Sequence, residues 1–140
     1  MRSYLPLAFV GIYALLLGIG TFLEKPALKL MNAYQMNALT AVGIAIVSVA
    51  ALLIVKPGLP SLTGTGVGLG LGALIGVGAL FYFLGLVKLP VSVAATVANT
   101  YVLITVVLSM LFLNDTMTLP KGIGIGLTIA GVMLLSYHSG

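Results

Sequence analysis

Two adjacent ionisable residues, Glu24 and Lys25, are the first candidates for chemistry in this sequence of 140 residues. Neighbouring residues on a helix point about 100° apart, so the two side chains would seek different partners. A charge inside a membrane is kept only if it is paired, reaches the interface or has a function. There Glu24 could exchange a proton and Lys25 could hold an anionic group. In a loop they would be ordinary interface charges, and the sequence leaves both interpretations open.

Uncharged polar residues in otherwise apolar stretches form the second set of candidates. Thr96 and Asn99 are three residues apart and share one helix face, which Tyr82 of the preceding stretch could reach. Because exposing Asn99 to lipid is costly, we expect it to face the interior of a helix bundle, whereas Thr96 more simply bonds to another helix. The predicted substrate or ion pathway consists of Glu24, Lys25, Tyr82, Asn99, Tyr101 and Thr21.

The remaining polar residues predict structure rather than catalysis. Asp115, with Thr118, is expected to cap the helix that follows, where a carboxylate also meets the positive helix end. The chain has no cysteine, and its one histidine, His138, has no second ligand nearby, so neither a metal site nor a cofactor is expected. No two catalytic groups can be placed together, which argues against an enzyme.

The elements that must position these residues are apolar and long. The chain is 61% hydrophobic and 6% charged, with a mean hydropathy of +1.27, which excludes an ordinary soluble domain. Five windows contain no Lys, Arg, Asp or Glu, and each is long enough to cross a bilayer as a helix: residues 3–23, 30–55, 57–87, 89–114 and 122–140. We therefore predict an all-α integral membrane protein of one domain, residues 1–140, with transmembrane helices at about 4–23, 31–55, 65–87, 91–113 and 120–137.

Glycines recur at helical spacing in two of these stretches. Small residues four apart let another helix approach closely in lipid, which predicts helix packing at Gly68, Gly72 and Gly76. Gly122 and Gly126 repeat the spacing near the C-terminus. A phosphate-binding loop would need a preceding strand and a Gly-Lys-Ser/Thr ending, and a rotor-ring subunit would need a carboxylate in mid-membrane on the next helix. The sequence has neither.

The basic residues give no preferred orientation in the membrane. The formal net charge is +4, but the cations are scattered singly and form no patch for nucleic acid. With the N-terminus inside, the two sides of the membrane would hold Arg2, Lys56 and Lys121 on one side and Lys25, Lys29 and Lys88 on the other. This balance favours insertion in both directions, and two opposed copies would form the inverted repeats of many transporters. Chance in so small a protein, or orientation by a partner, is the alternative.

Four segments of the chain form a recognisable set: Phe81–Leu86, Pro90–Ala95, Leu113-Asn114-Asp115 followed by Thr118, Gly124 and Gly131, and Gly18–Lys25 at the front. Together these segments resemble the EamA domain of the drug/metabolite transporter superfamily. The resemblance covers nearly the whole chain as one five-helix repeat, whereas typical members have two inverted repeats. It therefore implies a half-length member acting as a dimer. Tyr101-Val102 departs from the proline that the family commonly carries in this helix. The related small multidrug resistance proteins carry a coupling glutamate where this chain has Leu17.

These observations predict a secondary transporter in the prokaryotic inner membrane. It would export or exchange a small metabolite or drug-like molecule by alternating access, as an antiparallel homodimer within the lipid bilayer. The missing nucleotide motif excludes direct use of ATP. The competing hypothesis is a structural or accessory membrane subunit that docks onto a partner through its glycine-rich helix faces.

Overall fold

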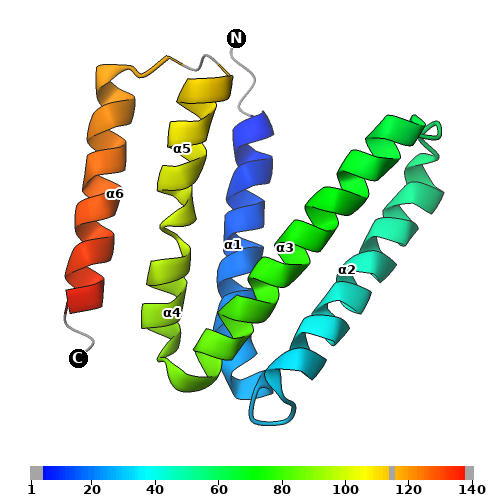
Figure 1. The fold of residues 1–140 in the computed structure, drawn as a ribbon, viewed down its shortest axis with the longest axis horizontal. Helices are drawn as coiled ribbons and strands as arrows, with labels where there is room; N and C mark the ends of the chain where they lie inside the picture. Colours follow the sequence, from blue (N-terminus) through cyan, green and yellow to red (C-terminus); the bar gives the residue numbers. More distant parts are fainter. Residues whose placement is uncertain (1–4, 114–115, 138–140) are drawn as a thin grey trace. The chain divides into compact units, whose positions relative to one another are not determined.

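The computed structural model describes residues 5–113 and 116–137, and every regular element in these ranges is a helix (Figure 1). The helices are α1 (Leu5–Ala27), α2 (Ala33–Val55), α3 (Leu62–Lys88), α4 (Val91–Ala98), α5 (Tyr101–Phe112) and α6 (Leu119–Tyr137). Four stretches are long and apolar enough to cross a membrane: α1, α2, α3 and the combined span Val91–Phe112. The fifth predicted span corresponds to α6, which has a shorter apolar stretch, Gly122–Leu134. The predicted all-α membrane fold is confirmed.

The chain divides into two compact units at the end of α3. Helices α1, α2 and α3 form the first unit, and α4, α5 and α6 form the second, with the boundary between Lys88 and Leu89. Most large apolar side chains are exposed, as expected for helices that face lipid. The side chains that are buried include Phe83 and Leu86 near the end of α3. Each unit is described below by itself.

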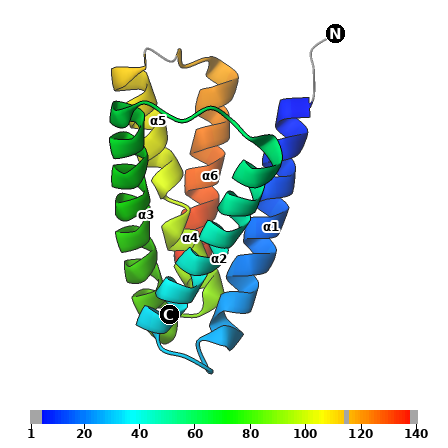
Figure 2. The ribbon, with the colours of Figure 1, turned by 90° about the vertical axis from the view of Figure 1, so that its right-hand side faces the viewer.

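Helices α2 and α3 run antiparallel in the first unit, and their ends are fixed by local hydrogen bonds. Asn32 caps α2: its side chain accepts from the Gln35 backbone at 2.9 Å, and the Gln35 side chain accepts from the Asn32 backbone at 3.0 Å. The connection to α3 follows Lys56, which has a left-handed backbone (φ 48°, ψ 52°), and Figure 2 shows it as an extended segment. The α3 helix begins three residues before the predicted start because the Ser61 hydroxyl accepts the Gly64 N–H at 3.1 Å.

The first helix continues past the residue at which the sequence predicts its end. Pro26 lacks an N–H, yet α1 extends to Ala27 rather than ending near Leu23. The last turn is closed by the N–H of Leu28, which donates to the Glu24 carbonyl at 2.9 Å. Glu24 and Lys25 are therefore helical residues at the end of a candidate membrane span, and the loop interpretation of their position does not hold.

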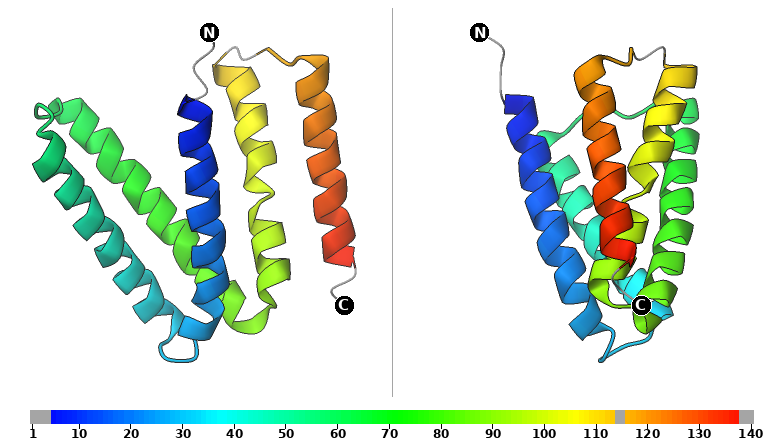
Figure 3. Two further views of the ribbon diagram at one scale, coloured as in Figure 1. Left: turned by 180° about the vertical axis from the view of Figure 1, so that it is seen from behind. Right: turned by 90° about the vertical axis from the view of Figure 1, so that its left-hand side faces the viewer.

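The span Val91–Phe112 of the second unit is interrupted near its middle, as Figure 3 shows. The sequence predicts a continuous helix over 91–113, but Asn99 and Thr100 form a turn between α4 and α5. Here the N–H groups of Thr100 and Val102 donate to carbonyls three residues back, at 3.1 and 3.2 Å. The Thr100 hydroxyl donates to the Val97 carbonyl at 2.7 Å. Back-bonding by threonine often bends helices, and here it accompanies a break that contains no proline.

The start of α6 bears on the predicted cap. Thr118 directly precedes α6, and its carbonyl accepts the N–H of Gly122 at 3.0 Å. Pro120 occupies the first turn, where its missing N–H costs nothing. Asp115 lies outside the described residues, so a capping role for its carboxylate stays a prediction.

The predicted glycine faces are open within the described part of the chain. A Cβ atom built onto Gly68, Gly72, Gly76 or Gly126 would meet nothing within 4 Å beyond its own helix neighbourhood. At Gly122 the nearest such atom is the sulfur of Met117, at 3.9 Å. Close packing at these glycines therefore stays a prediction that concerns a partner chain.

Candidate functional site

Four of the predicted pathway residues lie in the first unit, on α1 and α3. Thr21 and Lys25 are four residues apart on α1, and Tyr82 lies four residues before Leu86 on α3, so each pair occupies one helix face. The two helices are parallel: both run from N- to C-terminus in the same direction (Figure 1). Tyr82 accordingly interacts with Thr21, and Lys25 bonds to Leu86 one turn further on. The structure thus brings Thr21, Glu24, Lys25 and Tyr82 together in one polar cluster.

Lys25 joins the end of α1 to the end of α3. Its ammonium group donates to the backbone carbonyl of Leu86 and to that of Val87, the latter at 3.1 Å. The last carbonyls of a helix have no partner within the helix. The Leu86 carbonyl is a strict case, because the residue four positions later is Pro90, which has no N–H to donate. Leu86 is 0% exposed. Lys25 therefore supplies a hydrogen bond that Pro90 cannot provide.

Glu24 and Tyr82 carry buried polar atoms with unused bonding capacity. Both residues are half-buried, and the Tyr82 hydroxyl is close enough to the Glu24 carboxylate to interact electrostatically. Within the described residues, however, neither Glu24 Oε2 nor the Tyr82 hydroxyl makes a hydrogen bond of acceptable geometry. The Tyr82 ring packs edge-on to the buried Phe83 ring, with centroids 5.7 Å apart. A carboxylate and a hydroxyl that lie close together but do not satisfy each other with a well-formed hydrogen bond can bind a proton, a water molecule or a polar group of a ligand.

The other two predicted pathway residues belong to the second unit. Asn99 lies at the break between α4 and α5 with an exposed side chain, and Tyr101 begins α5 and is 53% exposed. Thr96, for which only helix packing was expected, is buried at 8% exposure. The Thr105 hydroxyl donates to the Tyr101 carbonyl of its own helix at 3.1 Å. The structure therefore groups Asn99 and Tyr101 with the break in the span, not with the polar cluster of the first unit.

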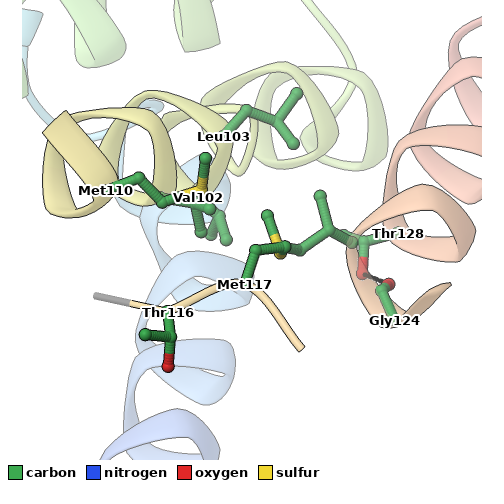
Figure 4. Close-up of a pocket in the computed structure, with 9 residues that line it drawn as sticks. Val102, Leu103, Met110, Thr116, Met117, Gly124 and Thr128 are labelled. Carbon is green, nitrogen blue, oxygen red and sulfur yellow. Dashed lines mark hydrogen bonds between the residues drawn. The ribbon is translucent and has the colours of Figure 1, made fainter. Parts of the chain in front are cut away.

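The second unit also contains a pocket that the sequence did not reveal (Figure 4). Its volume is about 340 Å³, and the residues that line it come from α5, α6 and the segment between them: Val102, Leu103, Val106, Met110, Thr116, Met117, Gly124, Ile125 and Thr128. Most of the lining side chains are apolar. The Thr128 hydroxyl donates to the Gly124 carbonyl of its own helix at 2.9 Å. Two methionines, Met110 and Met117, add flexible side chains that adapt to ligands of different shape. The spacing of Gly124 and Thr128, one turn apart on α6, is the signal that could have indicated it.

Neither unit offers a metal centre in the ranges that the structure describes. No group of three or more His, Cys, Asp or Glu residues occurs there. The polar cluster holds one carboxylate, one ammonium group and two hydroxyls, and the pocket of the second unit holds no charged side chain. These groups can exchange protons and bind a small molecule, and they define a multi-pass membrane protein with an ionisable pair in one of its spans.

Comparison with known proteins identifies the family. The sequence profile of the EamA-like transporter family matches residues 5–137, so this chain belongs to that family. It is therefore a membrane transporter of the drug/metabolite type, and its length fits a half-length member with a single repeat. The chain is 30% identical over 125 residues to the uncharacterized protein MJ1333.1 of Methanocaldococcus jannaschii, covering 89% of this chain and 91% of that protein. No solved structure matches the chain.

Proposed function

We propose that this protein is a secondary transporter that exports or exchanges a small metabolite or drug-like molecule across the prokaryotic inner membrane. The observation that carries the proposal is the polar cluster of Thr21, Glu24, Lys25 and Tyr82 within candidate membrane spans of an EamA-family chain. Ionisable groups at membrane depth are costly and mark substrate or ion pathways. The family match and the apolar spans support a transporter rather than an enzyme.

Glu24 is the group to which we assign coupling. Its buried, unpartnered oxygen faces a tyrosine hydroxyl, so it can take up a proton or release it to a bound substrate. Lys25 is occupied by the α3 carbonyls, and we therefore assign it a positioning role instead of the anion-binding role open to it in the sequence. The apolar pocket of the second unit supports a substrate with an apolar part.

The proposal includes a second copy of the chain in the opposite orientation. A single repeat supplies half of the inverted pair on which alternating access depends. Three features support a partner: the open glycine faces of α3 and α6, the exposed Asn99 within a candidate span, and the balanced basic residues. Reporters fused to the C-terminus should be active on both sides of the membrane, and activity on one side alone would exclude the antiparallel arrangement.

Transport in proteoliposomes tests the proposed function. A thermal-shift screen of metabolites in detergent first selects a ligand, which is then loaded into vesicles with and without a pH gradient. The wild-type protein should move the ligand, and Glu24→Gln should lose the gradient-driven part at least tenfold while still binding it. Asp115→Asn is the matched control, because Asp115 is the other acidic residue of the chain. If Glu24→Gln keeps full coupled transport, the coupling role is wrong.

A structural or accessory subunit is the second candidate function, and the open glycine faces favour it equally. The two functions differ on purification. A transporter dimer should be stable alone and move solute. An accessory subunit should be stable only together with another polypeptide, and that result would contradict the transporter.

A further inference from the structure

We propose that the Lys25 ammonium group fills a cation site at the C-terminal end of α3, built by the carbonyl oxygens of Leu86 and Val87, and that removing it turns this place into a binding site for a monovalent metal ion. Lys25 would then be a resident cation, and the wild-type protein would bind no alkali ion there. The inference concerns binding and stability, so it stands or falls independently of transport.

The first step is the chemistry of the helix end. The final carbonyls of α3 point beyond the helix, where the helix dipole adds negative potential. Pro90 cannot donate to Leu86, and Leu86 is fully buried, so water does not replace the missing donor. Two carbonyl oxygens that converge at a negative helix end require a positive partner. In transporters such carbonyls, freed where a helix is interrupted, coordinate sodium ions or protons.

The second step is the way Lys25 meets this requirement. Its ammonium group reaches the carbonyls of Leu86 and Val87 from α1, 61 and 62 positions earlier in the chain. An ammonium group has three donors, so it can bond to both carbonyls at once. The position of α1 that carries Lys25 is fixed by the continuation of the helix through Pro26. The cation at these carbonyls is therefore a side chain of the protein, the Lys25 ammonium group.

The third step is the balance of charge around the site. Glu24 precedes Lys25, and its partly buried carboxylate faces Tyr82, one helical turn from Leu86 on α3. With Lys25 present, the two formal charges of the cluster cancel. Without Lys25, one negative charge remains near two carbonyls that have lost their bond to the ammonium group, one of them on the buried Leu86. Oxygen ligands of this kind, carbonyls next to a carboxylate, are those that hard cations prefer.

The experiment compares Lys25→Met with the wild type and with Lys29→Met, a control that removes an equal charge from the exposed segment after α1. Thermal unfolding is measured in nanodiscs at constant ionic strength while sodium or potassium replaces choline. Lys25→Met should unfold at a lower temperature in choline, and sodium or potassium should raise its midpoint saturably by about 3 °C or more. The wild type and Lys29→Met should shift by less than about 1 °C.

Two results of the unfolding experiment would overturn the proposal. One is a Lys25→Met protein that responds to alkali ions no more than Lys29→Met does. The other is a wild-type protein that sodium or potassium stabilises as strongly as the variant. If Lys25→Met does not fold, Lys25→Ala is produced in the presence of propylammonium, which replaces the missing side chain. Propylammonium should restore folded protein and tetramethylammonium, which has no N–H, should not; equal effects of the two ions would also overturn the proposal.

Discussion

The Tyr82 hydroxyl leads to a prediction about stability whose sign is unusual for a buried tyrosine. Its oxygen is buried and makes no hydrogen bond of acceptable geometry with any described residue. A buried hydroxyl without a partner costs about 1–3 kcal/mol. Replacing Tyr82 with Phe keeps the ring against Phe83 and removes that cost, while it also removes the electrostatic interaction with Glu24. We expect Tyr82→Phe to stabilise the protein by about 1 kcal/mol, which is roughly 3 °C in melting temperature for a chain of this size.

The assay for Tyr82→Phe is unfolding in one detergent, by heat and by denaturant, together with ligand binding. Tyr13→Phe is the matched control, because Tyr13 lies on α1 and is 58% exposed, so removal of its hydroxyl should leave the stability unchanged. Binding of a transported ligand should weaken in Tyr82→Phe while stability rises, as is common where a functional site carries unsatisfied groups. A loss of more than about 1 kcal/mol would show that the hydroxyl is bonded in the native protein and would refute the reasoning.

Three further predictions concern other parts of the chain. Thr100→Val removes the hydroxyl that bonds to the preceding turn, and we expect a loss of about 1 kcal/mol in the free energy of unfolding; unchanged stability would mean that this bond does not hold the break. Gly124→Leu should fill the pocket of the second unit and weaken binding of an apolar fluorescent probe roughly tenfold, a cost of about 1.4 kcal/mol. Gly131→Leu, which has equal space on the same helix but lies outside the pocket, should bind the probe normally, and equal loss in both variants would place the probe elsewhere. Asn32→Ala removes the cap of α2 and should lower the free energy of unfolding by about 1 kcal/mol, measured by thermal unfolding. A loss no larger than that of an ordinary surface substitution would count against the cap.

The apolar pattern predicts the fold class well, because long uncharged windows have few structural solutions in lipid. The family is indicated instead by the resemblance of particular segments, and the profile match confirms it. The ends and interruptions of single helices are harder to predict, because they depend on hydrogen bonds to neighbouring groups. The sequence predicts that α1 ends near Leu23, but the helix continues through Pro26, and the N–H of Leu28 closes its last turn on the Glu24 carbonyl. Asn99 is a costly polar residue in a span, but the break beside it coincides with the hydrogen bond from Thr100 to the Val97 carbonyl, which the spacing of apolar residues does not predict.

The polar cluster could be predicted only in part. Glu24, Lys25, Thr21 and Tyr82 were all selected from the sequence as rare polar groups in apolar stretches. The partner of Lys25 was not, because it is a pair of backbone carbonyls 61 and 62 positions away. Every residue has a backbone carbonyl, so the sequence does not show which carbonyls accept from Lys25. The signal in the sequence is Pro90, four residues after Leu86, because its missing N–H leaves the Leu86 carbonyl without its usual helical donor.

The open glycines of the helices also have a practical consequence for observing motion. The chain contains no cysteine, so a cysteine placed at any position is a unique point of attachment. Gly43 of α2 and Gly126 of α6 each have free space where a side chain would begin, and they belong to different compact units. Spin labels or fluorophores at this pair would report the separation of the two units directly. With the labelled chain diluted in unlabelled chain, so that a dimer holds one labelled copy, conformational exchange during a transport cycle would be visible as a change in one measured distance.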